Sequence, residues 1–245
     1  MNSTNPYICI TGASRGIGRA IAIEFAKNGK DLVLVSSKSP KDLESVQSEV
    51  TAYGVNCLTY TTDVSDYKSV CDLKTALQAK SIRIDCVINN AGISYFGLIQ
   101  DMSPEDFNQV IQTNLSSVFY TTKLFVEDMI QNQKGCIINI SSVWGNVGAS
   151  CEAAYSASKG GVNAFTKALA KELAPSGIAV NAIACGAIDT SMNHRLSNEE
   201  KDALKNEIPI GRMGTPSEIA ELAYKLYSMN PYLTGQILTI DGGWT

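Results

Sequence analysis

The alternation of short apolar runs with helix-prone segments constrains the fold of this chain more than any other feature. The expected strands are Tyr7–Thr11, Leu32–Ser36, Cys57–Thr61, Ile84–Ile88, Cys136–Ile140, Ile178–Ala184 and Gln236–Ile240. The expected helices are Gly16–Asn28, Pro40–Tyr53, Asp66–Ala79, Pro104–Gln133, Ala153–Ala174 and Pro216–Ser228. Strands that are apolar throughout and separated by helices indicate a parallel sheet covered on both faces.

One domain accounts for the whole chain. A length of 245 residues suits one large domain or two small ones, and no linker, repeat or low-complexity stretch interrupts the alternation. We therefore expect a single doubly wound α/β domain over residues 1–245, with about seven parallel strands and helices on both faces.

Composition and charge argue against several classes of protein. The net charge of −4 does not suit binding to nucleic acid or an anionic membrane, and no apolar run approaches a bilayer span of roughly 18 residues. The segment Met1–Pro6 lacks the basic and apolar regions of a signal peptide. Seven cysteines without CxxC spacing indicate free thiols in a reducing cytoplasm. The single histidine, His194, leaves no Ser-His-Asp triad and no cluster of His ligands, so we expect no metal.

A glycine-rich turn follows the first expected strand directly. Gly12, Gly16 and Gly18 precede or open the first expected helix. Glycines let the backbone approach a pyrophosphate, whose charge is stabilised by free amides at a helix N-terminus. A tight turn without a ligand is the alternative. The strand before the turn and the helix after it favour a dinucleotide site.

Tyr155 and Lys159 are four residues apart in an expected helix, with Ser142 thirteen residues upstream of the tyrosine. Residues at this spacing share a helix face. A nearby ammonium lowers the pKa of a phenol, and a phenol tuned in this way can donate a proton to a carbonyl oxygen. A surface Tyr–Lys pair is the alternative, and Ser142 alone would suit a turn cap.

The motifs in this order resemble the short-chain dehydrogenase/reductase family. That family carries TGxxxGxG after its first strand, NNAG after its fourth, then a serine and a YxxxK pair. Here the same motifs are Thr11–Gly18, Asn89–Gly92, Ser142, and Tyr155 with Lys159. The resemblance covers nearly the whole chain and implies a Rossmann-type oxidoreductase.

The resemblance also implies roles for individual residues. The implied catalytic residues are Asn114, Ser142, Tyr155 and Lys159, where Asn114 bends the long helix, Ser142 binds the carbonyl oxygen and Tyr155 donates the proton. The implied cofactor-binding residues are Gly12, Ser14, Arg15, Gly16, Ile17, Gly18, Ser37, Lys38, Asp63, Val64, Asn90, Ala91, Gly92, Tyr155, Lys159, Gly186, Ile188 and Thr190. Asp63 also suits an Asx turn before the next helix.

The chain departs from the family pattern after its sixth expected strand. Cys185 stands where relatives have proline, which should loosen the turn before Gly186 because a fixed φ angle is lost. Cys151 and Cys185 are expected beside the substrate, with Lys159 biasing a nearby thiol toward thiolate, and two inert thiols are the alternative. The polar segment at about 190–210 corresponds to the substrate lid of relatives, and a plain surface helix is the alternative.

The end of the second expected strand bears on the choice of cofactor. Relatives that prefer NAD place an acidic residue there for the ribose hydroxyls. This chain has Ser36, Ser37 and Lys38, and Arg15 lies in the glycine turn. Solvated surface charges are the alternative for the two cations. The pattern favours NADP(H).

The C-terminal segments 209–216 and 234–243 most resemble bacterial 3-oxoacyl-[acyl-carrier-protein] reductases, which are homotetramers acting in fatty-acid biosynthesis. The resemblance implies reduction of a 3-oxoacyl thioester.

Docking of acidic acyl carrier protein would need positive charge at the active-site mouth, for which Gln131–Lys134, Lys167 and Lys171 are the candidates. A reductase or dehydrogenase of another ketone, sugar or steroid alcohol is the alternative substrate class. A non-catalytic nucleotide sensor of the same fold is the alternative outside the enzymes.

Overall fold

The computed structural model describes residues 6–193 and 197–245. Within these residues, seven strands form one sheet in the order β3-β2-β1-β4-β5-β6-β7, and all neighbouring strands are parallel. The strands are β1 (Tyr7–Thr11), β2 (Leu32–Ser36), β3 (Cys57–Thr61), β4 (Ile84–Asn89), β5 (Gly135–Ser142), β6 (Ile178–Cys185) and β7 (Ile237–Ile240). The expected doubly wound α/β fold is confirmed.

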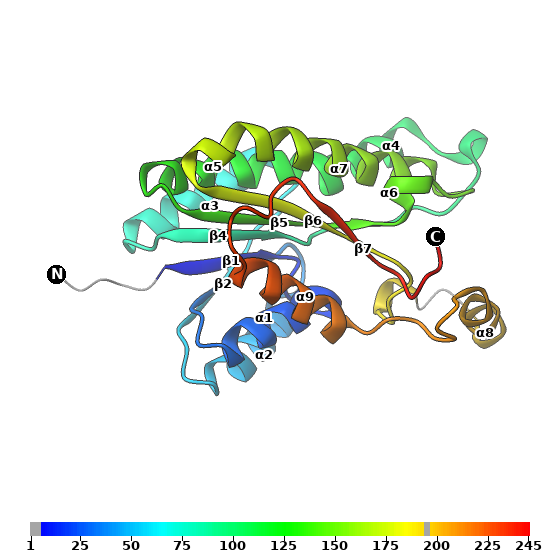
Figure 1. The fold of residues 1–245 in the computed structure, drawn as a ribbon, viewed down its shortest axis with the longest axis horizontal. Helices are drawn as coiled ribbons and strands as arrows, with labels where there is room; N and C mark the ends of the chain where they lie inside the picture. The colour runs from blue at the N-terminus through cyan, green and yellow to red at the C-terminus, as the bar shows by residue number, and fades with distance from the viewer. Residues whose placement is uncertain (1–5, 194–196) are drawn as a thin grey trace.

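Helices cover both faces of the sheet, as Figure 1 shows. The α-helices are α1 (Gly16–Lys27), α2 (Pro40–Thr51), α3 (Tyr67–Ala79), α4 (Pro104–Ile111), α5 (Ser117–Gln131), α6 (Trp144–Val147), α7 (Ala153–Leu173), α8 (Asn198–Glu207) and α9 (Pro216–Ser228). One face carries α1, α2 and α9, and the other carries α3, α5 and α7.

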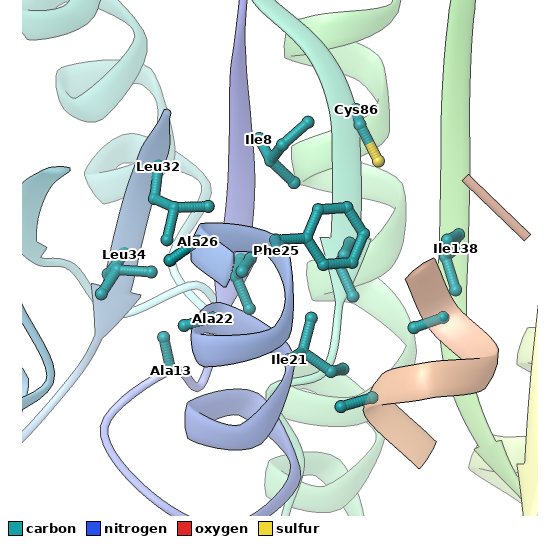
Figure 2. Packing of buried hydrophobic residues seen from close by; sticks show 14 of the residues in the cluster. Ile8, Ala13, Ile21, Ala22, Phe25, Ala26, Leu32, Leu34, Cys86 and Ile138 are labelled. Carbon is teal, nitrogen blue, oxygen red and sulfur yellow. The ribbon is translucent and has the colours of Figure 1, made fainter. Parts of the chain in front are cut away.

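Each face of the sheet has its own apolar core. On the first face the ring of Phe25 is fully buried among β-strand side chains, as Figure 2 shows, and it meets Tyr224 edge-on at a centroid distance of 5.3 Å. On the second face Phe125 and Met129 of α5 pack over the strands. Burial of one such side chain contributes about 1.5–3 kcal/mol, so the two cores hold the strand ends in fixed positions.

Local sequence signals explain where several helices begin. The Asp66 carboxylate accepts hydrogen bonds from the backbone of Lys68 and Ser69 and so caps α3. Thr215 forms a capping box with Glu218 at the start of α9. Such caps satisfy the backbone N–H groups that a helix N-terminus leaves without partners.

The sheet has a topological switch point between β1 and β4. Chain connections lead outward in opposite directions from these two neighbouring strands, so a crevice opens at their carboxyl ends. In Figure 1 the strands run from left to right, and α4, α6, α8 and the C-terminus gather at the right-hand edge. Ligands of doubly wound folds bind at this edge, so a site is expected there.

Two features are absent from the described part of the chain. No helix there is both long and apolar enough to cross a membrane. No three His, Cys, Asp or Glu side chains are grouped closely enough there to hold a metal ion. All seven cysteines are free thiols.

Candidate active site

The glycine turn between β1 and α1 is packed too tightly for side chains. A Cβ atom on Gly18 would lie 2.2 Å from the Gly12 carbonyl oxygen. Gly12 has φ +64°, and a Cβ there would lie 2.9 Å from the Cα atom of Ala91. Arg15, the N-cap residue of α1, makes no side-chain capping hydrogen bond. The turn therefore presents backbone N–H groups at a helix N-terminus, the arrangement that suits a phosphate.

A hydrogen-bond network joins this turn to the end of β4. The Asn90 side-chain amide donates to the carbonyl oxygens of Thr11 at 2.9 Å and Gly12 at 3.0 Å. The Thr11 hydroxyl accepts from the backbone N–H groups of Asn90 and Ala91, both at 3.0 Å. These hydrogen bonds join the glycine turn after β1 to the end of β4. The Asn90 side chain therefore maintains the conformation of the turn.

Arg15, Ser37 and Lys38 lie on neighbouring loops at the carboxyl ends of β1 and β2, and all three are exposed. The loops are joined by the backbone N–H of Ala13, which donates to the Val35 carbonyl oxygen at 3.0 Å. Among the described residues, neither Arg15 nor Lys38 forms an ion pair. Both cations are therefore available to an anionic ligand.

Asp63 lies after β3, where its carboxylate accepts from the backbone N–H of Ser65 at 3.0 Å and from the Ser65 hydroxyl at 2.7 Å. Asp63 therefore forms the Asx turn that was considered as its alternative role. The cap of α3 is provided by Asp66. Val64 is buried beside it. The implied contact of Asp63 and Val64 with adenine stays a prediction.

Ser142, Tyr155 and Lys159 lie together at the carboxyl end of β5. Ser142 is the last residue of β5, and the other two lie on consecutive turns of α7. The Ser142 hydroxyl is hydrogen-bonded to the Tyr155 phenol and accepts from the Trp144 backbone N–H at 3.2 Å. The Lys159 ammonium lies 5.7 Å from the centroid of the Tyr155 ring. Ser142 is therefore both the cap of a turn and a partner of the phenol.

The pKa of Tyr155 shifts in the direction opposite to the one expected from its spacing to Lys159. Burial raises the pKa of the phenol above its ordinary value, and the Ser142 hydrogen bond offsets the rise only in part. Burial also lowers the pKa of Lys159 to about 8. The Lys159 ammonium donates to the Ile140 carbonyl oxygen at 2.8 Å, so it is directed to main chain and not to the phenol oxygen.

Asn114 lies in a π-helical turn, Gln112–Ser116, that interrupts the long helix between α4 and α5. The regular helix is therefore interrupted at the position where the bend was expected. Asn114 is 1% exposed, although a mid-helix asparagine ordinarily faces solvent. Its amide accepts from the Ile93 backbone N–H at 2.8 Å and donates to the Ser158 hydroxyl at 3.0 Å. Asn114 thus connects the loop after β4 to Ser158 of α7, the residue next to Lys159.

Sequence reasoning missed Ser158 as part of this arrangement. Its fully buried hydroxyl donates to the Tyr155 carbonyl oxygen at 2.7 Å while accepting from Asn114. The only available signal was its place next to Lys159. Gly92 completes the cluster, because a Cβ there would lie 3.3 Å from the Asn114 amide oxygen and 3.6 Å from the Lys159 ammonium nitrogen.

The segment after β6 closes the site from the other side. A Cβ on Gly16 would lie 3.5 Å from the Thr190 methyl carbon, so Thr190 faces the glycine turn across the crevice. Ile188 is buried and forms a parallel bridge to Gly214. Gly186 donates its N–H to the Ile240 carbonyl oxygen at 2.9 Å. The residues expected to hold the nicotinamide therefore lie opposite those expected to hold the pyrophosphate.

Cys185, which stands in place of the family proline, is the last residue of β6. It is buried and pairs in register with Ser142 on one side and Ile240 on the other. Burial raises the pKa of its thiol to about 12, and the nearby Lys159 offsets this only partly. Lys159 thus favours the Cys185 thiolate as expected, but burial has the larger effect, so the net shift favours the thiol and the alternative of an inert thiol. The loosened turn stays a prediction.

The lid expected at about 190–210 contains a short helical turn, Ser191–Asn193, and the helix α8. Residues 194–196, including His194, lie outside the described residues. No residue of α8 is buried, although Ile208 immediately after it is. The plain-helix alternative thus describes α8 itself, and its role as a lid stays a prediction.

The positive charges expected to receive a carrier protein lie away from the site. Lys134 precedes β5, so about 23 Å of strand separates it from Ser142. Lys167 and Lys171 lie about 18 and 24 Å along α7 from Tyr155. The placement of this expected docking surface is wrong because these residues are at or toward the amino ends of the strands.

Comparisons with known proteins agree with this geometry. The family model described as short chain dehydrogenase matches residues 6–201. The chain is 40% identical over 244 residues to an uncharacterized oxidoreductase of Bacillus subtilis, covering 98% of this chain and 99% of that protein. It is 38% identical over 239 residues to the 3-oxoacyl-[acyl-carrier-protein] reductase of Chlamydia pneumoniae, covering 97% and 96%. A crystal structure of an actinorhodin polyketide ketoreductase variant with NADPH superposes with a TM-score of 0.92 at 33% identity, covering 98% of this chain and 97% of the other.

Proposed function

The chain belongs to the short-chain dehydrogenase/reductase family, and we propose that it is an NADP(H)-dependent reductase of 3-oxoacyl thioesters. The observation that carries the proposal is the contact between Ser142 and Tyr155 above the buried Lys159, at the carboxyl edge where the glycine turn opens. A nucleotide sensor would need no such proton donor.

The residues around the crevice fit a dinucleotide. The close-packed glycines leave the α1 amides exposed to a pyrophosphate, and Arg15 with Lys38 offers charge for a 2′-phosphate. Thr190 and Ile188 would lie beside the nicotinamide. When bound, NADP(H) supplies the hydride for reduction of a carbonyl.

The chain's own groups would orient the carbonyl and move the proton. Because the Ser142 oxygen accepts from the Trp144 N–H, its hydroxyl hydrogen is left to donate to the Tyr155 or carbonyl oxygen. The raised pKa keeps a proton on the Tyr155 oxygen at neutral pH, so the phenol is present in the form that a general acid needs, although a pKa nearer neutrality would make it a stronger donor. Two donors, Ser142 and Tyr155, then meet the negative charge that develops on the carbonyl oxygen. Lys159, whose pKa burial lowers to about 8, places a titratable amine 5.7 Å from the centroid of the Tyr155 ring.

The surroundings of the site support an apolar acyl chain. Phe96 and Ile99 after β4, Val147 at the end of α6 and Ile210 after α8 are exposed at the carboxyl edge of the sheet. Single exposed apolar residues are ordinary, but four on three segments at one edge of the sheet suit a hydrophobic substrate.

The charge at this edge favours a second candidate, a ketone that is not attached to a carrier. The helix α8 carries four carboxylates against two lysines. Asp101, Glu105 and Asp106 lie at the start of α4, at the same edge. An acidic carrier protein would be repelled by such a surface. A small 3-oxoacyl thioester or another free ketone would not need to dock there.

One panel of substrates tests both candidates. Initial rates would be measured with NADPH and NADH against a carrier-linked 3-oxoacyl thioester, the matching short thioester, and ketones without a thioester. The proposal expects NADPH-dependent reduction of the thioesters and higher kcat/KM with NADPH than with NADH. Good rates on free ketones with none on thioesters would favour the second candidate. Stoichiometric nucleotide binding without any turnover would indicate a sensor.

Assembly and location are also part of the proposal. The family resemblance supports a homotetramer in the cytoplasm, and light scattering of the purified protein would test the tetramer. A monodisperse monomer or dimer would contradict it.

A further inference from the structure

The only two tryptophans of the chain contact each other across about a hundred residues. Trp144 begins α6, and Trp244 is the penultimate residue. Their ring centroids are 4.8 Å apart and the rings are inclined at 60°, an edge-to-face arrangement. Aromatic pairs of this kind contribute about 0.5–1.5 kcal/mol beyond the area they bury. The contact attaches the C-terminal segment to the turn that follows Ser142.

The Trp144 turn is fixed to the catalytic groups on its inner side. Its backbone N–H donates to the Ser142 hydroxyl at 3.2 Å. A Cβ on Gly145 would lie 2.7 Å from the Lys159 carbonyl carbon, so α6 packs directly on α7 at that residue. The Asn163 amide donates to Asn146 at 2.9 Å and strengthens this packing. A displacement of Trp144 would therefore also move the Ser142 hydroxyl, which is proposed to bind the carbonyl oxygen.

The Trp244 segment is fixed in turn by the end of the lid. The Asp241 carboxylate accepts from the backbone N–H groups of Gly243 at 2.9 Å and Thr245 at 2.8 Å, which folds the last residues into a turn. The Ile210 N–H donates to the Gly242 carbonyl oxygen at 3.2 Å. A Cβ on Gly242 would lie 2.6 Å from a methyl carbon of Ile210. Figure 1 shows the C-terminal segment between α6 and the end of α8.

The same segment borders the expected nicotinamide loop. A Cβ on Gly186 would lie 2.7 Å from the Cα atom of Asp241. Ile188, Ile210, Asp241 and Gly242 line a common cavity of about 150 Å³. The C-terminal turn therefore touches the lid, the nicotinamide loop and the serine turn.

We propose that Trp244 is a positioning residue, through which the C-terminal segment couples the position of residues 208–210 to the orientation of the Ser142 hydroxyl. The proposal rests on the proposed function, because Ser142 is taken to bind the carbonyl oxygen. Closing of residues 208–210 over a substrate would press the C-terminal turn toward Trp144 and hold Ser142 in place for the reaction.

The test is a set of tryptophan variants assayed on one reducible carbonyl. Trp244→Ala is expected to lower kcat about tenfold and to leave the NADPH Kd within twofold. Trp244→Phe retains an aromatic ring and is expected to keep at least half of the wild-type kcat. Trp144→Ala combined with Trp244→Ala should be no slower than the slower single variant, because both disrupt one contact. Tyr232→Ala, which alters a 96% exposed aromatic residue near the C-terminus, is the matched control and should change nothing.

The lid side of the coupling has its own pair of variants. Gly242→Ala places a methyl group against Ile210 at φ +69° and is expected to raise KM at least fivefold and to lower kcat. Gly211→Ala imposes a similar φ of +75° with no atom within 4 Å, so it controls for backbone strain and should leave KM within twofold. Near-UV circular dichroism gives a readout that does not depend on activity. The wild-type tryptophan bands should differ from the sum of the Trp144→Phe and Trp244→Phe spectra.

The outcomes separate this proposal from the proposed function. A wild-type protein that reduces no carbonyl would overturn both. An active wild type whose Trp244→Ala variant keeps full kcat would overturn this proposal alone, as would losses that multiply in the double variant. Loss of activity that follows a change of oligomeric state in light scattering would assign Trp244 to a subunit contact and also overturn it. Trp244→Leu replaces the alanine variant if the latter fails to fold, with the same expected loss of kcat.

Discussion

The two sides of the crevice are built in different ways. On the cofactor side, backbone meets backbone, and a Cβ on Gly18 would lie 2.2 Å from the Gly12 carbonyl oxygen. On the substrate side, side chains meet side chains, as Trp144 meets Trp244, and the neighbouring helix α8 buries no residue. Backbone packing at this distance tolerates only glycine, whereas side-chain packing can be replaced by other side chains of similar volume. The cofactor side is therefore readable from short motifs, and the substrate side is not.

The largest effect is expected where the two sides meet. Tyr155→Phe removes the proton donor while keeping the ring, so kcat should fall about 10²–10⁴-fold, the usual contribution of general acid catalysis. The NADPH Kd should change little, because Lys159 and the glycine turn are intact. Steady-state rates and a nucleotide-binding titration measure the two quantities. A loss below tenfold in folded protein would refute the role of Tyr155.

The second prediction tests the backbone packing on the cofactor side. Gly18→Ala would place a methyl group 2.2 Å from the Gly12 carbonyl oxygen, and moving that turn should weaken NADPH binding at least about 100-fold. Gly29→Ala, just beyond the other end of α1, has φ +70° and no atom within 4 Å. It should lose about 1 kcal/mol of stability and bind NADPH normally. Equal affinities in the two variants would show that the turn does not cradle the nucleotide.

The accuracy of the predictions made from the sequence also differs from one part of the molecule to another. The order of apolar runs predicted every strand to within two residues at either end, because buried parallel strands leave a continuous apolar signal. Family motifs identified Asn114, where a π-helical turn interrupts the long helix, whereas helix propensity alone would have placed its side chain toward solvent.

Two features were missed because they depend on distances between residues that are far apart in the sequence or buried together, which no local pattern encodes. The pKa of Tyr155 rises because the half-buried phenol loses solvation, and the Lys159 ammonium donates to the Ile140 carbonyl oxygen. The contact between Trp144 and Trp244 has no signal in either segment. Lys134 is a different case, because a residue that precedes a parallel strand lies at the amino edge, and the order of elements already placed it away from the site.

The third prediction concerns charge on the cofactor side. Lys38→Ala should weaken NADPH binding about 10–100-fold, the range for loss of one charge-assisted hydrogen bond, and leave NADH binding nearly unchanged. Lys41→Ala removes an exposed lysine in the first turn of α2 and serves as the matched control. Titration of each variant with both nucleotides measures the effect. A wild type that uses NADH with equal or better kcat/KM would contradict the assignment of NADP(H).

The fourth prediction uses Lys159, which lies between the two sides. Burial lowers its pKa from 10.5 to about 8, so from pH 8 to 10 the unfolded chain binds more protons at this residue than the folded chain. The free energy of unfolding of the wild type should therefore rise with pH in this window, relative to Lys159→Met, by about 2–3 kcal/mol. Urea unfolding at several pH values measures it. Comparing the two proteins cancels the groups they share, and a difference that stays constant with pH would contradict the lowered pKa.

The smallest effect is expected from charge on the substrate side. Glu199→Lys replaces a carboxylate in the first turn of α8 and should raise kcat/KM for a carrier-linked 3-oxoacyl thioester about two- to threefold at low salt. Lys171→Glu, in the last turn of α7, should have no effect, because its charge lies beyond the Debye length of about 8 Å from the active site. The gain should disappear at 0.5 M salt, where surface charges are screened, and neither variant should alter rates on the short thioester. If Lys171→Glu instead lowered the carrier-linked rate alone, the carrier would dock along α7, and the acidic edge around α8 would not be what limits its approach.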